Sequence, residues 1–506
     1  MGGRGTGGTA ALVIAALMVA VLSFAAPASA ARIEVETGAD QFGSGPECSL
    51  REAFRSANDD TAFGGCRSGD GRDTLLLGSR THTLTRTGAD DDTTTNGDLD
   101  VTEPVTIRGR DADSTKIDGN GATVGERVME VLGSGQVRVL DLAVVDGFAT
   151  SPEGNGGGIN LDGDGALVVR RSRISNNRAA VDGAGLNVDD SGGVLRINSS
   201  TVTRNLADSN GGGINAEQSH RVVVLDMLIA DNEVDGCCNG GGIDIDNGDL
   251  VVKNSEIRGN TVEGNGAGIY GSGDELEISD SSIVNNSTTG NGGGLLTRSG
   301  PSNVRGTTIA RNDAFIGGGI VVINDGPLDV LNSTISGNAA DRSGGGIGVT
   351  ALNGSVELRS TTVADNVADA DQNMDGDGGG VFVNEDVASS AFSLLNTLLA
   401  GNRDRSGNDE DCAGPLMSEG YNLVGVDGCI DDQQGDQIGT ASNPIDPRIG
   451  PLASNDGATK THTLRSNSPA VNAGNPGQPG SGDPACPQRD QRGEPRSNCD
   501  IGAFER

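Results

Sequence analysis

The 506-residue sequence contains no tryptophan, and aromatic residues make up only 2% of it. A globular core packed around large rings is therefore disfavoured, and a narrow core of aliphatic side chains is favoured. Basic residues are also scarce, because 36 Lys and Arg stand against 71 Asp and Glu, and the net charge is -35. This balance argues against nucleic acid and anionic membrane surfaces as partners, since both bind basic faces. It favours cations, cationic surfaces or simple solubility.

Histidine is rare as well, with three residues, and no Cys-x-x-Cys pair occurs, so a zinc site is not predicted. Long apolar runs are absent beyond the N-terminus. There, Arg4 precedes an apolar run over 10–26 and a small-x-small site at 28–30. This order is typical of a secretory signal peptide that is cut after Ala30. We therefore expect export, and no membrane span in the mature chain.

Export permits disulfides, and eight cysteines allow many connectivities. Proximity along the chain predicts three local pairs, which are Cys48 with Cys66, Cys412 with Cys429, and Cys486 with Cys499. Cys237 and Cys238 are adjacent. For these two, a strained vicinal disulfide, two free thiols and an intermolecular bond are equally open.

Glycine, in contrast, is abundant, with 82 residues, and much of it belongs to a repeat. A Gly-Gly/Ala-Gly triplet followed by an aliphatic residue recurs from Gly156 to Gly378. Between the triplets, an aliphatic residue three positions before an Asn recurs from Ile174 to Asn402. Both motifs return after about 26–28 residues, and a fixed period in this range is typical of a solenoid.

Within each repeat, apolar residues alternate over short runs, as in Leu167-x-Val169 and Leu250-x-Val252, and Gly, Asn, Asp and Ser bound each run. Such strands bury little alone, but coils stacked ~4.8 Å apart bury a continuous aliphatic column. The sequence therefore predicts an all-β fold, a parallel β-helix. Gly triplets would turn its corners, and one Asn per coil would join a hydrogen-bonded ladder. The spacing leaves the handedness open.

A short helix is predicted before the repeats. Ser49 and Glu52 have capping-box spacing, and Leu50, Ala53 and Phe54 share one apolar face. We expect this helix to cover the open end of the solenoid, where an exposed strand edge would otherwise pair with another chain.

Three parts of the chain resemble known families. The segment 48–54, Cys-Ser-Leu-Arg-Glu-Ala-Phe, resembles the CSLREA domain found at the N-terminus of many exported bacterial proteins. The repeats resemble those of polymorphic outer-membrane proteins, although the hydrophobic residue before Asn is aliphatic here rather than Phe. Segments 447–452, 468–474 and 499–505 are similar to the choice-of-anchor Q domain that closes such proteins.

These resemblances imply an exported right-handed β-helix of the pectin lyase-like fold. Members that are retained at the surface carry an anchor after the closing domain, and this chain stops at Arg506, so release or non-covalent retention is expected. The expected organisation is a signal peptide (1–30), an N-terminal cap with the first coils (31–109), β-helix repeats (110–402) and a disulfide-stapled closing domain (403–506).

Right-handed β-helices include pectate lyases, pectin lyases and polygalacturonases, so catalysis is a candidate function. The hydrolases of this fold need Gly-His-Gly and Arg-Ile-Lys, and both are missing. Lyases use a Lys or Arg base, and the densest basic cluster, Arg170, Arg171 and Arg173, is interpreted as a solvated corner. We therefore expect a non-catalytic binding or adhesion module for a glycan or surface protein. A polysaccharide lyase or hydrolase and a purely structural spacer are the alternatives.

One outward column of the early coils is acidic. Carboxylates ~4.8 Å apart repel, and they either raise their pKa values or recruit a cation. Calcium suits oxygen ligands, so the pattern predicts a weak calcium row, with a screened acidic face as the alternative. The members are Asp162, Asp189, Glu217 and Asp246, with Asp244 beside them.

In later coils the same outward column becomes apolar, and its members are Tyr270, Leu296, Val321 and Phe382. Exposed residues of this kind predict a binding strip for a glycan or a protein partner. The alternative is that a loop, such as the inserted segment 369–377, covers them.

Overall fold

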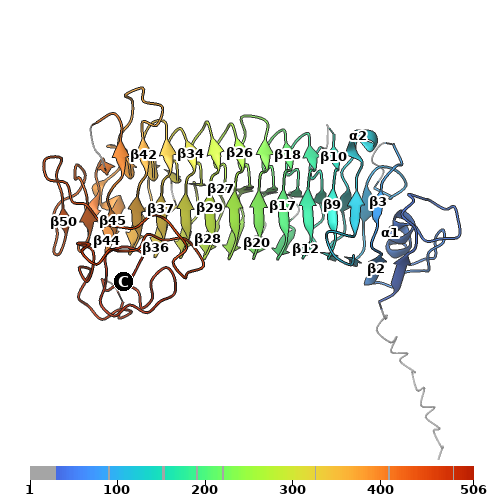
Figure 1. Ribbon diagram of the computed structural model, residues 1–506. Coiled ribbons are helices and arrows are strands. Elements are labelled where there is room, and N and C mark those ends of the chain that lie inside the picture. Colours follow the sequence, from blue (N-terminus) through green and yellow to red (C-terminus); the bar gives the residue numbers. More distant parts are fainter. Residues whose placement is uncertain are drawn as a thin grey trace, which may run out of the picture.

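The computed structural model describes residues 30–88, 92–150, 154–189, 192–218, 221–324, 326–407, 411–482 and 484–506. The signal peptide predicted at 1–30 lies outside these residues, apart from its last one. Over the described residues the chain forms a right-handed parallel β-solenoid of about 12 turns (Figure 1). The prediction of an all-β, right-handed parallel β-helix is therefore confirmed.

Short strands form four parallel sheets, here named A to D, with 14, 14, 12 and 10 strands in the described residues. Sheet A consists of β1 (Arg32–Val35), β2 (Asp73–Leu77), β5 (Val105–Arg108), β8 (Gln136–Leu140), β12 (Ala166–Arg170), β16 (Val194–Asn198), β20 (Arg221–Leu225), β24 (Asp249–Lys253), β28 (Glu275–Ser279), β32 (Ser302–Arg305), β36 (Leu328–Leu331), β40 (Val356–Arg359), β44 (Phe392–Leu395) and β48 (Met417–Ser418). Sheet B consists of β3 (Thr81–Thr83), β6 (Lys116–Asp118), β9 (Ala143–Val145), β13 (Arg173–Ser175), β17 (Thr201–Thr203), β21 (Leu228–Ala230), β25 (Glu256–Arg258), β29 (Ser282–Val284), β33 (Thr308–Ala310), β37 (Thr334–Ser336), β41 (Thr362–Ala364), β45 (Leu398–Leu399), β49 (Leu423–Val424) and β50 (Gln437–Ile438).

The other two sheets complete each coil. Sheet C consists of β4 (Leu99–Val101), β7 (Met129–Val131), β11 (Ile159–Leu161), β15 (Leu186–Val188), β19 (Ile214–Glu217), β23 (Ile243–Asp246), β27 (Ile269–Ser272), β31 (Leu295–Thr297), β35 (Ile320–Asn324), β39 (Ile347–Leu352), β43 (Val381–Val383) and β47 (Cys412–Ala413). Sheet D consists of β10 (Phe148–Ala149), β14 (Arg178–Ala179), β18 (Leu206–Ala207), β22 (Glu233–Val234), β26 (Thr261–Val262), β30 (Ser287–Thr288), β34 (Asp313–Ala314), β38 (Ala339–Ala340), β42 (Val367–Ala368) and β46 (Arg403–Asp404). A typical coil passes through sheets C, A, B and D in that order, and the stack extends beyond the repeat block 110–402 at both ends.

The core is the aliphatic column that the alternation predicts. In sheet A, Leu167, Leu195 and Val222 lie in register on successive coils and are fully buried. Burying one such side chain stabilises a fold by about 1.5–3 kcal/mol, so every added coil strengthens the stack.

The predicted asparagine ladder is also present. Each side-chain amide donates to the Oδ1 atom of the Asn on the next coil, over 2.8–3.0 Å. The last one, Asn402, donates to Oδ1 of Asp411 over 2.9 Å. Because a carboxylate only accepts, Asp411 closes the row of donors. The ladder residues are Asn177, Asn205, Asn232, Asn260, Asn286, Asn312, Asn338, Asn366 and Asn402.

The N-terminal end carries the predicted helix α1 (Leu50–Asn58), and its capping box between Ser49 and Glu52 is formed. The helix packs against β1, β2 and β4. Its Arg51 is fully buried and bonded to Asp40 over 2.7 Å. A four-residue helix, α2 (Gly121–Val124), and a 3-10 helix at Ser389–Ala391 are the other helical pieces in the described chain. None of the described helices has the length and apolar character needed to cross a membrane.

All three predicted disulfides are confirmed, joining Cys48 to Cys66, Cys412 to Cys429 and Cys486 to Cys499. Of the options left open for the adjacent pair, the structure has two free thiols, an exposed Cys237 and a half-buried Cys238.

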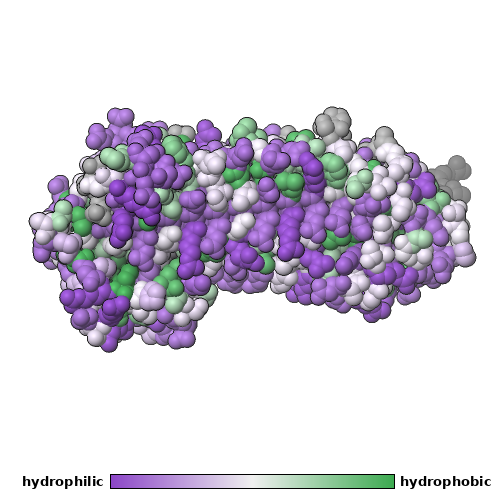
Figure 2. Space-filling view, turned by 45° about the horizontal axis from the view of Figure 1, so that its top comes forward, coloured by the Kyte–Doolittle hydropathy of each residue, from purple (hydrophilic) through white to green (hydrophobic). Residues whose placement is uncertain are grey.

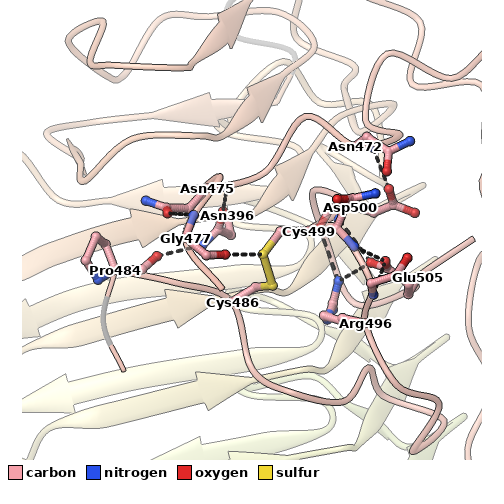
Figure 3. The surroundings of a disulfide bond; sticks show 12 residues. Asn396, Asn472, Asn475, Gly477, Pro484, Cys486, Arg496, Cys499, Asp500 and Glu505 are labelled. Carbon is pink, nitrogen blue, oxygen red and sulfur yellow. Dashed lines mark hydrogen bonds and ion pairs between the residues drawn. A yellow bond between two sulfur atoms is a disulfide. The ribbon is translucent and has the colours of Figure 1, made fainter. Parts of the chain in front are cut away.

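The C-terminal segment, residues 445–506, folds back along the outer face of sheet B (Figure 1). Its Leu464, Ile501 and Phe504 pack on Leu398 and Leu423 of the solenoid. Around the Cys486–Cys499 bond, the Asn396 amide donates to the Pro484 carbonyl oxygen over 3.2 Å (Figure 3). The segment is thus tied to the solenoid by both apolar and polar contacts.

Candidate functional site

A groove of about 1080 Å³ lies where the outer face of sheet B meets the corner to sheet A. The turn at Ala112 and Asp113 forms its wall toward the N-terminus, and Ala458 of the C-terminal segment forms the opposite wall. In Figure 2, the lower outline of the molecule is recessed between the C-terminal segment and the N-terminal part. The solenoid face between these two walls is therefore open.

The floor of the groove consists of the first residues of five successive strands of sheet B. Side chains alternate along a strand, so these residues face outward while the next residue, such as Ile174, is buried. Two floor residues carry hydroxyl groups, two are charged and one is aliphatic. They are Arg173, Thr201, Leu228, Glu256 and Ser282, and they pair in register.

The rim of the groove is a second column, at the tight corner between sheets A and B. Its residues have φ angles between 47° and 52°, which makes a one-residue bend in each coil, and they are Arg171, Ser199, Asp226, Asn254 and Asp280. Behind the rim, serine hydroxyls such as that of Ser200 accept a backbone N–H from the neighbouring coil over 3.0 Å. Those buried hydroxyls are bonded to the backbone and stabilise the corner. A ligand in the groove would therefore contact the rim and floor residues instead.

Both arginines of the groove are paired. Arg171 donates two hydrogen bonds to Asp141, over 2.6 and 2.8 Å, and Arg173 lies 3.2 Å from Asp113. The bond to Asp141 raises the pKa of Arg171, and the same bond lowers the pKa of the Asp141 carboxyl. Arg171 is therefore not placed to lose a proton and act as a base.

The carboxylates of the groove are spread along it. No three carboxylates among Asp113, Asp226, Glu256 and Asp280, all of which the structure describes, have oxygens within 4.8 Å of one another. Three acids converging beside an arginine are therefore absent from these four residues. What the groove offers is hydroxyl, amide and paired charged groups for hydrogen bonding.

The residues of the predicted calcium row follow sheet C. Glu217 and Asp246 pair in register, Asp162 and Asp246 are exposed, and Asp189 is half-buried. Asp189 accepts hydrogen bonds from the amides of Asn155, Asn160 and Asn187, over 3.2, 3.0 and 2.6 Å. Three amide groups therefore surround the Asp189 carboxylate, at the place where the predicted calcium row would put a cation.

No three carboxylates of the predicted row, all of them described, have oxygens within 4.8 Å of one another. In the described chain, one such group of three carboxylates occurs elsewhere, at Asp92, Asp100 and Glu130, and Asp427 lies close to the disulfide-bonded Cys412 and Cys429.

Asp244 lies apart from the exposed members of the row. It continues a column of buried amides on sheet C, next to Asn215, and is only 3% exposed. Desolvation raises the pKa of Asp244 well above its usual value, and the charges of Asp246, Asp182 and Glu217 raise it further.

The expectation of an exposed apolar strip is wrong for Tyr270, Leu296 and Val321, which are 7%, 1% and 0% exposed, while Phe382 is half-buried. The chain corner before each strand of sheet C curls over this column. A Cβ atom on Gly266 would lie 2.7 Å from Cβ of Tyr270, which shows how close the corner comes. The three buried side chains form a small cluster with Ile316 and Ile323.

Sequence reasoning singled out Arg171 and Arg173 as a solvated corner and missed the groove that they line. The strand alternation places Thr201, Leu228 and Ser282 outward, but these residues share no type that would single them out. Its wall at Ala458 comes from a segment far away in the chain, which no local pattern indicates.

One comparison with known proteins, a match to a family model, agrees with the fold. A family model described as the right handed beta helix region matches residues 144–283 and 228–388. A crystal structure of pectate lyase Pel9A is similar over 95% of this chain and 98% of that chain, with 14% sequence identity and a TM-score of 0.35. No curated protein matches the sequence. The chain is thus similar to the right-handed β-helix family over its central coils.

Proposed function

We propose that the protein is an exported, non-catalytic β-helix that binds a glycan in the groove between the 112–113 turn and the C-terminal segment. The observation that carries this proposal is the lining of the groove, which is rich in hydrogen-bonding groups and has both of its arginines paired with carboxylates. Sugar hydroxyls both donate and accept hydrogen bonds, so they match such a surface. The signal-like N-terminus and the three disulfides support export.

The C-terminal segment supports the choice of an extended polar ligand. On the coils next to the groove, Thr308 donates to the Lys460 carbonyl oxygen over 2.6 Å, and Asn332 donates to the Arg489 carbonyl oxygen over 2.7 Å. Thr308 continues the floor column after Ser282 in register. The face that forms the groove therefore already binds backbone carbonyl groups of the C-terminal segment through its hydroxyl and amide groups.

The test is glycan binding by the exported chain and by a double variant, Thr201→Glu with Ser282→Arg. Each new side chain fills the groove floor and can pair with a charged neighbour in register, Arg173 or Glu256, so the fold is kept. We expect a glycan identified on an array to bind at least about tenfold more weakly by calorimetry, since floor contacts are lost.

The matched control places the same residue types on sheet D, as Thr261→Glu with Ser287→Arg, which also pair in register. Equal binding by both variants would contradict the groove as the site. Release of unsaturated sugar ends from uronate polymers, with or without calcium, would contradict the absence of catalysis.

A further inference from the structure

The outer face of sheet A carries a row of cations in its N-terminal half. Two columns of this face point outward from β2 to β24. One column is Thr74, Thr106, Arg138, Val168, Arg196, Val223 and Val251, and the other is Leu76, Arg108, Leu140, Arg170, Asn198, Leu225 and Lys253. Five of these residues are basic and none is acidic, although acidic residues outnumber basic ones by 71 to 36 in the whole chain.

Four of the cations form a zigzag. Arg108, Arg138, Arg170 and Arg196 lie on four successive coils, β5, β8, β12 and β16, and they alternate between the two columns. We call these four residues the cationic row. Successive strands are ~4.8 Å apart, so the row presents about one positive charge per coil along the solenoid axis.

The cationic row is exposed, and most of it is not neutralised. All four arginines are exposed. Among the residues that the structure describes, Arg138, Arg170 and Arg196 have no carboxylate within 4.0 Å. Arg108 lies 3.5 Å from Asp141, but that carboxylate is held by Arg171.

The C-terminal half of the same sheet is built differently. There Asp329 pairs with Arg359 over 2.6 Å and with Arg305 over 3.7 Å, and Glu277 and Glu357 stand in the outward columns. Ion pairs thus neutralise the cations of the later coils, whereas Arg108 alone of the cationic row lies within 4.0 Å of a carboxylate in the described residues. The early and late coils of sheet A therefore differ in how their cations are paired. An ordinary solvated surface would not explain why unpaired arginines gather on the early coils alone.

A pocket of about 540 Å³ extends the row at its N-terminal end. Arg32, Arg110 and Arg171 line it together with Arg108, and Glu34 and Asp141 are its acidic residues. Cations therefore outnumber carboxylates in the pocket as well, and the row and the pocket form one continuous basic surface.

We propose that the cationic row binds a linear anionic polysaccharide that carries about one carboxylate or sulfate per sugar and lies along the solenoid axis. The spacing of one cation per coil resembles the rise of one sugar ring in an extended chain. Between the arginines, Leu140 and Val168 are half-buried and offer apolar contacts to the C–H faces of sugar rings. The positive charge of the row indicates that the ligand is an anion. The spacing of one cation per coil indicates that the ligand is a polymer with regularly spaced charges.

Nucleic acid fits this surface less well. Single-stranded nucleic acid is held by bases stacked on aromatic side chains, and only 2% of the chain is aromatic, with no Trp. A duplex carries a denser charge, which the net charge of -35 repels over long range. A flexible polymer of lower charge density touches the row and keeps away from the acidic surfaces.

The cationic row lies on sheet A and the groove on sheet B, and they meet at Arg171, which lines both the groove and the pocket beside the row. The inference does not rest on the function proposed for the groove. The test uses the full exported chain and a triple variant, Arg138→Gln, Arg170→Gln and Arg196→Gln. The probes are a polyuronate and a sulfated glycan of the same charge density, and the neutral, carboxyl-reduced form of the polyuronate. We expect at least one charged polymer to bind, and the neutral form not to bind.

In the triple variant, we expect binding of that polymer to fall by about tenfold or more, and the slope of log K against log salt to fall by about 2, because three charge contacts are lost. The control replaces three paired arginines with the same charge change, as Arg178→Gln, Arg258→Gln and Arg305→Gln, and is expected to bind like the parent. A Lys version of the triple variant is expected to retain binding, which separates loss of charge from loss of fold.

Several outcomes would overturn the proposal. They are failure of both charged polymers to bind, equal binding by the triple variant and the parent, and tighter binding of a DNA duplex than of either polymer. The groove variant Thr201→Glu with Ser282→Arg is expected to bind the charged polymer as the parent does. Failure of the groove function and failure of the row are therefore distinguishable.

Discussion

At the scale of single residues, Asp244 ends a column of buried amides. The amides of Asn187 and Asn215 each donate to the Oδ1 atom of the previous coil over 2.9 Å, and Asn160 donates to Glu130 over 3.0 Å. All donors point toward the N-terminus, so Oδ1 of Asn215 is left without a donor among the described residues. Asp244 is the next residue in register. Only its protonated carboxyl can supply the missing hydrogen.

We therefore expect Asp244→Asn to stabilise the protein at neutral pH by about 1–3 kcal/mol, because Asn donates to Asn215 without needing a proton. The pKa of Asp244 is raised in the folded state, so the folded protein binds the proton more tightly than the unfolded chain. Stability is highest below the unfolded pKa of about 3.9 and falls as the pH rises through the folded value. The gain from Asn should thus shrink as the pH is lowered from neutral towards the unfolded pKa of about 3.9, as measured by urea unfolding.

The control is Asp246→Asn, at an exposed position in the same strand, which is expected to change stability by less than about 0.5 kcal/mol. A variant Asp244→Asn that is less stable than the parent only in millimolar calcium would contradict the protonated carboxyl. That result would instead support the predicted calcium row.

At the scale of the elements, the Asn ladder holds one corner of the solenoid. Asn260 accepts two hydrogen bonds from Asn232, over 3.0 and 2.9 Å, and its amide donates to Asn286 and to the Ile229 carbonyl oxygen, over 2.9 and 3.2 Å. Leu has a similar volume but makes none of these bonds. We expect Asn260→Leu to destabilise the protein by about 3 kcal/mol, since several buried polar groups lose their partners.

Because each coil contacts only its neighbours, the damage should be local. Hydrogen exchange is expected to speed up in β21, β25 and β29 and to stay unchanged in β5 and β8. The exposed neighbouring change Thr261→Ala is the control. Equal acceleration in all coils would show that the solenoid unfolds as one unit and would contradict this prediction.

The elements were largely predictable, and the site was not. Ile257 and Asn260 repeat with a fixed phase, so the strand and the ladder can be inferred from the sequence. Alternation separates two faces of a strand but does not say what lies over the outer one. For this reason the sequence left open whether the strip at Tyr270 is exposed or covered by a loop such as 369–377, and it did not indicate the corner at Gly266 that lies over it.

At the scale of the whole molecule, the overall composition gave no indication of the basic surface formed by the cationic row. The net charge of -35 suggested that basic faces are lacking, but a sum over the chain does not reveal where charges gather. Arg108, Arg138, Arg170 and Arg196 are about 30 residues apart, and only the coil register places them side by side. The sequence therefore predicted the solenoid that aligns these residues, without showing their alignment.

The C-terminal segment should loosen as a separate unit when its disulfide is removed. Replacing both Cys486 and Cys499 by Ser opens a loop that the bond closes, at a cost of about 3 kcal/mol. The coils keep their own core, so faster hydrogen exchange is expected in residues 459–506 and not in β13 to β25. Glycan binding in the groove should weaken, because the wall at Ala458 becomes mobile.

Removing the bond between Cys48 and Cys66 is the control, since it lies beside α1 at the far end. Its loss is expected to leave exchange in residues 459–506 as it is. If both changes loosened the whole chain alike, the C-terminal segment would not be a separate unit.

The one-per-coil spacing of the cationic row has a consequence for movement. Because the arginines alternate between two columns, a regular polymer meets the same arrangement of charges again after a shift of two coils, ~9.6 Å, so more than one alignment has a similar energy. This degeneracy adds a favourable entropy of mixing that a single fixed site lacks. It also lets the polymer diffuse in one dimension along the solenoid without leaving it, much as proteins slide along DNA through sequence-independent charge contacts.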